Sequence, residues 1–198
     1  MDSNKSLVEM ARENGLITLG NRPLNAIGPN GTIRLATYDS EIKNLDSDRD
    51  VKTIENFINV VAERLVKMEV EDDIMSFAPM QVIATGWKNF PNTETVDGVF
   101  DKRFIPFIQR IYENDIPGEL LPLLSQVKSI LLLYAKRNMT RETKKHVEHL
   151  QRLGILKTND ARSVSQAAIE YCFNSGIDHV LVGMRKPAYV DSCRQFFG

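Results

Sequence analysis

The segment HVLVGMRKPAYVDSC, from His179 to Cys193, decides which fold the sequence predicts. HVLVG is a short apolar run that ends at Gly183, as is typical of a strand buried on both faces of a parallel sheet. Pro187 suits the first position of a helix, so the segment predicts a strand, a turn and a helix. Arg185 and Lys186 lie in that turn. They are either ordinary cations of a solvated loop or part of an anion-binding site.

An anion is a reasonable ligand for this turn on physical grounds. The N-terminus of a helix presents unpaired amides and about half a positive charge. Gly183 lets the backbone approach a ligand closely, and Arg185 can bind a phosphate through two N–H groups, whereas Lys186 supplies a point charge. A glycine at a strand end and cations in a loop are, however, common in any α/β protein.

A matching segment lies near the N-terminus. LITLG, from Leu16 to Gly20, is a second short apolar strand. It is preceded by a predicted helix over about Lys5 to Glu13, which Gly15 is expected to end. The turn GNRPLNA follows it and contains Arg22. Because ligands gather at the carboxyl ends of parallel strands, Arg22 and Arg185 are expected at the same edge, where they predict an anion-binding site. A surface arginine in a proline-containing turn is the alternative. The residues after it, up to Gly31, are rich in proline and glycine and predict no regular structure.

The middle of the chain, residues 32–160, has a helical period. Its apolar stripes are Ile54, Phe57, Ile58, Val61, Leu65 and Met68, and then Leu120, Leu124, Val127, Leu131 and Tyr134. Asp50 is the predicted cap of the first of these helices. Ser163 and Gln166 form a capping box that begins another helix before the second strand. The order is therefore α-β, a helical block, then α-β-α with parallel strands. Two strands alone do not form a stable sheet, so the predicted fold is incomplete.

Composition excludes several classes of protein. The chain has 198 residues, of which 42% are hydrophobic and 26% charged, with a net charge of -1. Without a basic excess, neither nucleic acid nor an anionic membrane surface is an expected partner. No apolar run approaches the roughly 20 residues of a membrane span. The N-terminus resembles no signal peptide, and the two cysteines are too few for a disulfide framework, so a cytoplasmic location is expected.

Other candidate sites are weak. His146 and His149 are three residues apart on a predicted helix, but no further ligands are evident, so no metal site is predicted. Cys172 and Cys193 lie on apolar helical stripes and are expected in the core. The sequence contains no Ser-His-Asp order and no glycine-rich phosphate loop. The two arginine-containing turns are therefore the only candidate functional site that the sequence predicts.

Taken together, the two turns resemble the aldo-keto reductases. GLITLGNRPLNA is similar to their seventh strand and the loop after it, and SVSQAAIEYCFNSGIDHVLVGMRKPAYVDS to their seventh helix, eighth strand and the start of the eighth helix. The resemblance covers residues 8–26 and 163–197, and the middle matches a long helical insertion only in position and character. It implies an α/β fold, an incomplete (β/α)8 TIM barrel consisting of the last two strand-helix units plus a mainly helical insertion. The chain would then be one partial barrel domain: helix, strand 7 and loop over 5–26, the insertion over 32–160, and helix, strand 8 and last helix over 161–198.

The resemblance also implies a cofactor site, because the family reduces carbonyl compounds with NADPH and holds the cofactor phosphates in these two loops. The implied cofactor-binding residues are Asn21, Arg22, Leu24, Gly183, Met184, Arg185, Lys186 and Tyr189. Asn21 stands where many members stack an aromatic ring on the nicotinamide. Tyr189 stands where many place an arginine for the 2′-phosphate, and Ser192 and Cys193 replace a Glu-Asn pair that contacts adenine. The preference for NADP over NAD therefore stays open.

The catalytic Asp, Tyr, Lys and His of the family belong to its first four strand-helix units and have no counterpart here. The expected function is that of the C-terminal part of an NADP-dependent oxidoreductase, which binds cofactor phosphates and reduces a small carbonyl substrate in the full-length enzyme. A partner chain that completes the barrel is the other possibility. Whether this chain is itself an enzyme stays open. The alternative is a non-catalytic helical interaction or scaffold protein that keeps a barrel remnant, because the two apolar stripes need partners.

Overall fold

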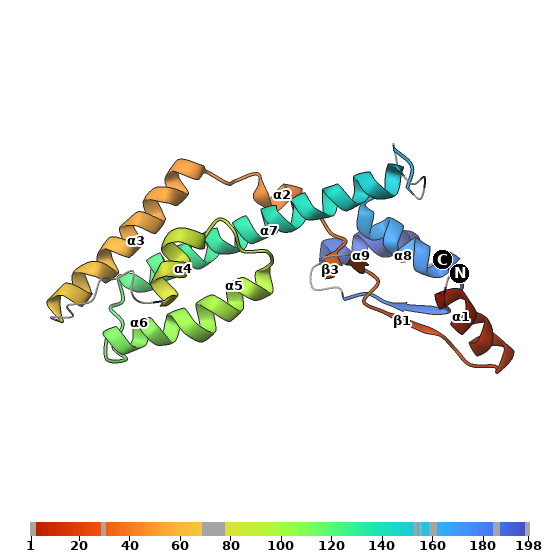
Figure 1. The fold of residues 1–198 in the computed structure, drawn as a ribbon, viewed down its shortest axis with the longest axis horizontal. Coiled ribbons are helices and arrows are strands. Elements are labelled where there is room, and N and C mark those ends of the chain that lie inside the picture. Colours follow the sequence, from red (N-terminus) through yellow and green to blue (C-terminus); the bar gives the residue numbers. More distant parts are fainter. Residues whose placement is uncertain are drawn as a thin grey trace. The chain divides into compact units, whose positions relative to one another are not determined.

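The computed structural model describes residues 3–28, 31–68, 78–152, 154, 156–158, 162–183 and 187–196. Helices make up 67% of the structure, and the strands of the described residues are four short ones in two small sheets (Figure 1). The predicted fold class, an α/β incomplete TIM barrel, is therefore wrong, and the protein is mainly helical. The physical reason is that each strand is only three or four residues long, whereas amphipathic helices occupy most of the chain between them.

The helices are α1 (Ser3–Glu13), α2 (Asp39–Ile42), α3 (Ser47–Lys67), α4 (Ala78–Gly86), α5 (Thr93–Val99), α6 (Ile105–Ile111), α7 (Leu120–Arg152), α8 (Val164–Asn174) and α9 (Pro187–Cys193). A π-helical turn, Phe100–Phe104, joins α5 to α6, and a 3₁₀ turn, Arg194–Phe196, follows α9. The strands are β1 (Leu19–Asn21), β2 (Asn25–Gly28), β3 (Gly31–Arg34) and β4 (His179–Leu181). Among the helices that the structure describes, none is both long and apolar enough to cross a membrane.

The chain forms two compact units. Unit 1 consists of Met1–Thr37 and Glu142–Gly198, and unit 2 of Tyr38–Arg141. The strands all belong to unit 1, together with α1, α8 and α9. Unit 2 contains α2 to α6 and the first part of α7. The turns predicted to bind a cofactor therefore lie in unit 1.

Unit 2 buries both predicted apolar stripes. The buried members are Ile54, Phe57, Val61 and Leu65 of α3 and Leu120, Leu124, Val127, Leu131 and Tyr134 of α7. Aromatic side chains fill the space between the helices: the ring of Phe104 lies 5.4 Å from that of Phe57, and Trp87 lies 4.7 Å from Tyr134, both edge to face. The partners that the stripes require are thus supplied within the unit.

The start of α3 differs from the prediction. Asp46, and not Asp50, is the N-cap, because its carboxylate accepts a hydrogen bond from the backbone N–H of Arg49 at 3.2 Å. The observed N-cap therefore lies four residues before the predicted one. Asp50 itself is buried, with its side chain only 1% exposed.

Unit 1 contains a parallel pair and a hairpin. β1 and β4 are parallel, with Leu19 opposite His179 and Asn21 opposite Leu181, as the prediction of parallel strands requires. They are not buried as predicted, since Leu19 is 60% and Leu181 is 51% exposed. β2 and β3 form an antiparallel hairpin. β2 lies in the segment up to Gly31 that was predicted to have no regular structure, and β3 continues into the start of the block predicted to be helical, so both predictions are wrong at this hairpin.

In unit 1 the structure confirms the predicted features that involve only residues close together in the sequence. The Ser163 hydroxyl accepts a hydrogen bond from the backbone N–H of Gln166, and the Gln166 side chain accepts one from the backbone N–H of Ser163. This is the predicted capping box at the start of α8. Gly15, in a left-handed conformation with a φ of 65°, follows α1 and ends it.

Candidate functional site

The candidate site lies at the carboxyl ends of β1 and β4. Because the two strands are parallel and Asn21 lies opposite Leu181, the chain leaves both strands at the same edge of the small sheet. Arg22 to Leu24 follow β1 there, and Gly183 follows β4. The structure therefore brings the two predicted turns together, although they are far apart in the sequence.

The first turn has a defined backbone. Arg22 adopts a left-handed conformation with a φ of 56°, which is uncommon for a residue other than glycine. The backbone N–H of Asn25 donates a hydrogen bond to the carbonyl oxygen of Arg22 at 3.0 Å, and Pro23 occupies the second position of this four-residue turn. The carbonyl oxygen of Leu24 accepts a hydrogen bond from Leu35 at 2.7 Å, which ties the turn to the β2–β3 hairpin. Two backbone hydrogen bonds therefore fix the turn that begins at Arg22.

The side chains of this turn differ in exposure. Asn21 and Arg22 are exposed, and Leu24 is half-buried. Within the described part of the chain, the guanidinium of Arg22 makes neither a hydrogen bond nor an ion pair. Its donors are therefore available to a ligand. Leu24 contributes packing rather than a polar contact.

The second turn is only partly described. Gly183 is exposed, and a Cβ placed on it would meet no atom within 4 Å among the described residues. Its backbone is not in the left-handed region, so neither conformation nor crowding within the described chain requires a glycine there. Met184, Arg185 and Lys186, which were predicted to bind the cofactor phosphates, lie outside the described residues.

Tyr189 lies in α9, with 38% of its surface exposed. Its carbonyl oxygen accepts a hydrogen bond from the hydroxyl of Ser192 at 2.8 Å, and the carbonyl oxygen of Ser192 accepts one from the Gln166 side chain. These bonds tie α9 to the start of α8. Because α9 is only seven residues long, its N-terminus contributes little to an anion site.

Sequence reasoning missed the pair that holds the opposite, amino end of the strands. The carboxylate of Asp178 accepts hydrogen bonds from the backbone N–H and the hydroxyl of Thr18, at 2.8 and 2.6 Å. These bonds lower the pKa of Asp178 below its ordinary value. The only sequence signal of this contact is a threonine inside the first predicted strand and an aspartate directly before the second. The pair sets the register that brings the two turns to one edge.

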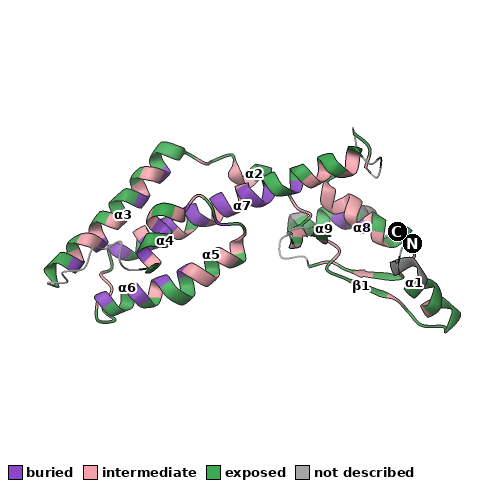
Figure 2. Cartoon of the chain, viewed as in Figure 1, coloured by how far each residue is buried: buried purple, intermediate pink, exposed green. Residues whose placement is uncertain are grey.

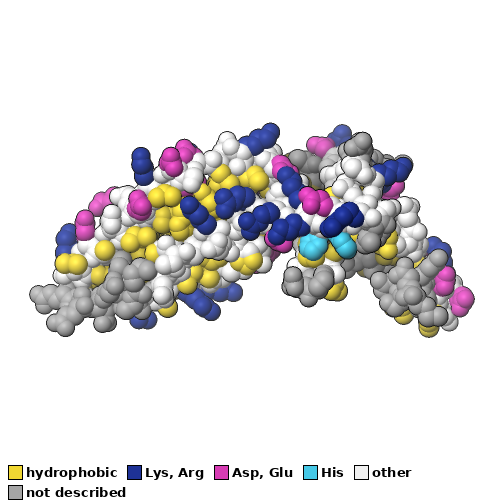
Figure 3. All heavy atoms as spheres, turned by 45° about the horizontal axis from the view of Figure 1, so that its top comes forward, with side chains coloured by type: hydrophobic (Ala, Val, Ile, Leu, Met, Phe, Trp, Pro, Cys, Tyr) yellow, Lys and Arg dark blue, Asp and Glu magenta, His cyan; other side chains and the backbone are white. Residues whose placement is uncertain are grey.

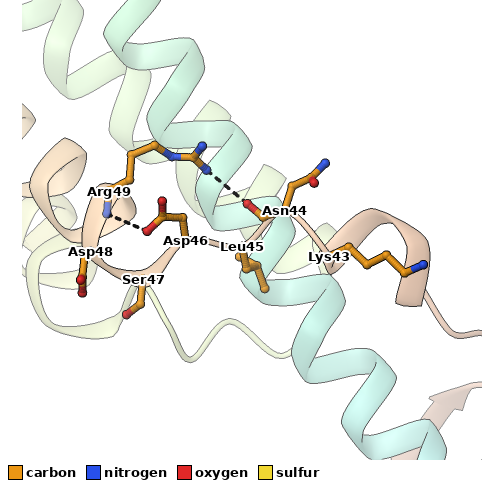
Figure 4. A pocket seen from close by; sticks show the side chains of 7 residues that line it. All are labelled: Lys43, Asn44, Leu45, Asp46, Ser47, Asp48 and Arg49. Carbon is orange, nitrogen blue, oxygen red and sulfur yellow. Dashed lines mark hydrogen bonds between the residues drawn. The ribbon is translucent and has the colours of Figure 1, made fainter.

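Unit 2 offers a shallow hollow at the start of α3, lined by Lys43, Asn44, Leu45, Asp46, Ser47, Asp48 and Arg49 (Figure 4). Two of its side chains are already paired: Asp46 accepts a hydrogen bond from the backbone N–H of Arg49, and the Arg49 guanidinium donates one to the carbonyl oxygen of Asn44 at 3.3 Å. Nearby, the Oδ2 atom of Asp50 is buried without a hydrogen-bond partner among the described residues, but Asp50 does not line the hollow. No predicted site residue lies here.

The other candidate groups do not assemble into a site. His146 is half-buried and His149 is exposed. Figure 3 shows lysine and arginine side chains beside the histidine side chains on the face that it draws. Among the described residues, no group of three or more His, Cys, Asp or Glu is arranged to hold a metal ion. Both cysteines are free thiols. Burial raises the pKa of Cys172, and Cys193 is buried, so neither is set up as a nucleophile.

The site is therefore an edge of a two-stranded parallel sheet that carries one unpaired arginine and one open glycine, with no acid-base pair beside them in the described residues. Comparison of the chain with protein families, with curated proteins and with solved structures found no match in any of the three.

Proposed function

We propose that the turns after β1 and β4 bind the phosphate groups of a dinucleotide cofactor, NADP(H). The chain would thereby contribute a cofactor site to an oxidoreductase of the aldo-keto reductase type, which reduces small carbonyl compounds. One observation carries the proposal: Asn21 and Leu181 are paired in a parallel register, so both turns leave the sheet at one edge. Ligands of parallel sheets collect at this edge.

The chemistry of the described residues supports a phosphate ligand. The guanidinium of Arg22 is exposed and makes no contact within the described chain, so binding a phosphate there breaks no existing ion pair. Arginine binds phosphate oxygens through two parallel N–H groups. Gly183 leaves open space in which a phosphate can approach the backbone.

The proposed activity needs catalytic residues that are not found in the described part of the candidate site. Hydride transfer to a carbonyl requires a proton donor near the nicotinamide, and the described part of this edge holds no acid-base pair. We therefore propose that a partner polypeptide supplies the catalytic groups, while this chain holds the cofactor phosphates. The two free thiols suit a reducing compartment such as the cytoplasm.

We do not propose the alternative function, a helical interaction protein, because the structure does not support the argument given for it. Its argument was that the stripes of Ile54 to Met68 and Leu120 to Tyr134 need external partners. In the described part of unit 2 these stripes pack into a common core, and only Met68, 37% exposed, reaches the surface appreciably. The apolar side chains that do lack cover lie mainly in unit 1.

The experiment is an NMR titration of the ¹⁵N-labelled chain with NADPH, with NADH as a second arm. We expect the amide signals of Arg22 and Gly183 to shift on binding. An Arg22→Ala change removes a charge-assisted bond of about 1.5–3 kcal/mol, so the dissociation constant should rise roughly 10- to 100-fold. Weaker binding of NADH would assign part of the affinity to the 2′-phosphate.

Arg103→Ala is the matched control, because Arg103 is also exposed but lies in unit 2. It should bind NADPH as the unaltered chain does. Equal affinities of the unaltered chain and the Arg22→Ala variant would contradict the proposal, and so would the absence of any shift at millimolar NADPH. A combined Arg185→Ala and Lys186→Ala variant tests the cations that lie outside the described residues.

A further inference from the structure

A second hollow of unit 2 lies between α3 and the beginning of α7. Its volume is about 420 Å³, within the range of small-molecule sites. The lining includes Asn56 and Val60 of α3, Leu123 and Gln126 of α7, and Tyr112, which follows α6. Buried and exposed residues alternate along both helices at the helical period, so the hollow is a groove between two helices above their common core (Figure 2).

This groove has an apolar middle and polar ends. Val60 and Leu123 are half-buried and pack against the core. Glu119 directly precedes α7, and Gln126 lies roughly 10 Å further along the helix at the usual rise per residue. Asn56, Leu123 and Gln126 also line a neighbouring hollow that Glu119 does not line. The two amides therefore lie together at the end away from the carboxylate.

The polar side chains of the groove have unused hydrogen-bonding capacity. In the described part of the chain, the side chains of Asn56, Glu119 and Gln126 make neither a hydrogen bond nor an ion pair. Burial raises the pKa of Tyr112, so its hydroxyl is an uncharged donor and acceptor at neutral pH. A ligand can bind all four groups without breaking an existing contact.

The charge beside the groove is negative. Among the described residues, Glu119 is the only charged side chain that lines it. The loop between α6 and α7 also contains Glu113 and Asp115, and the sequence from Ile111 to Val127 contains no lysine, arginine or histidine. A cation is therefore favoured here and an anion is disfavoured.

Arg64 does not cancel this preference. Its guanidinium lies 5.3 Å from the centre of the Tyr112 ring, and its Nε donates a hydrogen bond to the carbonyl oxygen of Ile111 at 3.0 Å. Arg64 does not line the groove. The carboxylate of Glu119 is thus left without a cationic partner in the described part of the chain.

We propose that this groove binds an alkylammonium group. The ammonium pairs with Glu119, and an apolar stem at least as long as that of lysine covers Val60 and Leu123. A neutral apolar ligand would cover the carboxylate without a partner, which is unfavourable. A free aliphatic amine and the lysine side chain of a partner protein offer the same chemistry. The groove belongs to unit 2, and the proposal does not depend on the cofactor site of unit 1.

An NMR titration of the ¹⁵N-labelled whole chain with n-hexylamine tests the proposal. We expect the side-chain amide signals of Asn56 and Gln126 and the backbone signal of Leu123 to shift. Glu119→Gln should raise the dissociation constant about three- to fivefold at low ionic strength, the effect of one exposed ion pair. Because Glu119 is exposed, this variant should fold as the unaltered chain does. n-Hexanol, which has the same stem without the charge, should bind more weakly.

Asp115→Asn is the matched control, because it removes the same charge from the same loop at an exposed position that does not line the groove. It should leave the dissociation constant nearly unchanged. Equal weakening by Asp115→Asn and Glu119→Gln would overturn the proposal, and so would equal affinities for hexanol and hexylamine or no shift at tens of millimolar amine. A lysine residue capped at both ends is the second ligand. Tighter binding than hexylamine would assign the groove to a lysine of a partner, and weaker binding to a free amine.

Discussion

Asp178 and Thr18 lie 160 residues apart in sequence and exchange three hydrogen bonds. The Asp178 carboxylate accepts from the backbone N–H and the hydroxyl of Thr18 at 2.8 and 2.6 Å, and its own backbone N–H donates to the Thr18 hydroxyl at 2.9 Å. The next residue, His179, donates its backbone N–H to the carbonyl oxygen of Thr18 at 3.1 Å. This pair joins the beginnings of β1 and β4 and so fixes the edge at which both turns emerge.

The pair predicts a dependence of unit 1 on pH. Hydrogen bonds from Thr18 lower the pKa of Asp178 in the folded state. The contribution of the carboxylate to stability is therefore complete above the ordinary pKa of an aspartate and is lost as the pH falls through the lowered, folded value. Hydrogen exchange at the backbone amide of His179, followed between neutral and acidic pH, should show protection falling in that range.

Asp178→Asn is the control for this dependence. The amide keeps one acceptor oxygen but does not ionise, so the protection of the His179 backbone amide should be lower at neutral pH and should no longer fall in the acid range. A variant that keeps the same acid-range loss as the unaltered chain would assign the effect to another group.

The core of unit 2 predicts a large cost for truncating Leu131. Its side chain is fully buried, so Leu131→Ala should lower the free energy of unfolding by about 2–5 kcal/mol. Trp87 is the only tryptophan of the chain and lies against Tyr134 in this core, so its fluorescence reports urea unfolding of unit 2. Leu121→Ala, at an exposed position of the same helix, should change the free energy by less than about 0.5 kcal/mol. Similar losses in the two variants would contradict the assigned core.

The hydroxyl of Thr143 should stabilise unit 1 through its hydrogen bonds to backbone carbonyl oxygens. Its buried Oγ1 lies 2.6 Å from the carbonyl oxygen of Arg34 and 3.1 Å from that of Ala36. Thr143→Val keeps the shape but removes the donor, which should cost about 0.5–1.5 kcal/mol because two partly buried carbonyl oxygens lose their hydrogen-bond donor. Hydrogen exchange over residues 31–37 should accelerate. Thr143→Ser retains the hydroxyl and should exchange nearly as the unaltered chain does, whereas acceleration in both variants would point to packing instead.

Replacement by alanine should have different effects at Gly183 and at Gly176. A Cβ on Gly183 meets nothing within 4 Å among the described residues, so Gly183→Ala should leave the melting temperature unchanged while weakening the proposed NADPH binding. Gly176 has a φ of 86°, and a Cβ there would lie 3.0 Å from the guanidinium of Arg12. Gly176→Ala should therefore destabilise unit 1 by about 1–2 kcal/mol. An unaltered NADPH affinity of the Gly183→Ala variant would contradict the proposal that Gly183 leaves space for a phosphate to approach the backbone.

The sequence determined by itself those features that depend on neighbouring residues. The capping box of Ser163 and Gln166, the helix stop at Gly15 and the apolar stripe from Ile54 to Leu65 each involve residues within a few turns of one helix. Their geometry follows from backbone hydrogen bonding and the helical period, and the structure confirms them. The parallel orientation of β1 and β4 also followed, because each strand is preceded by its own helix.

Only the tertiary structure decided what surrounds these elements. Apolar runs predicted two strands buried on both faces, but burial depends on what packs against a strand, and Leu19 and Leu181 are 60% and 51% exposed. The prediction of a barrel remnant was wrong for a similar reason. Two local sequence motifs do not show how small a sheet their strands form. The contact between Thr18 and Asp178 joins groups 160 residues apart, which no local pattern encodes. That distant contact places Arg22 and Gly183 at one edge, and with it the site for which a function is proposed.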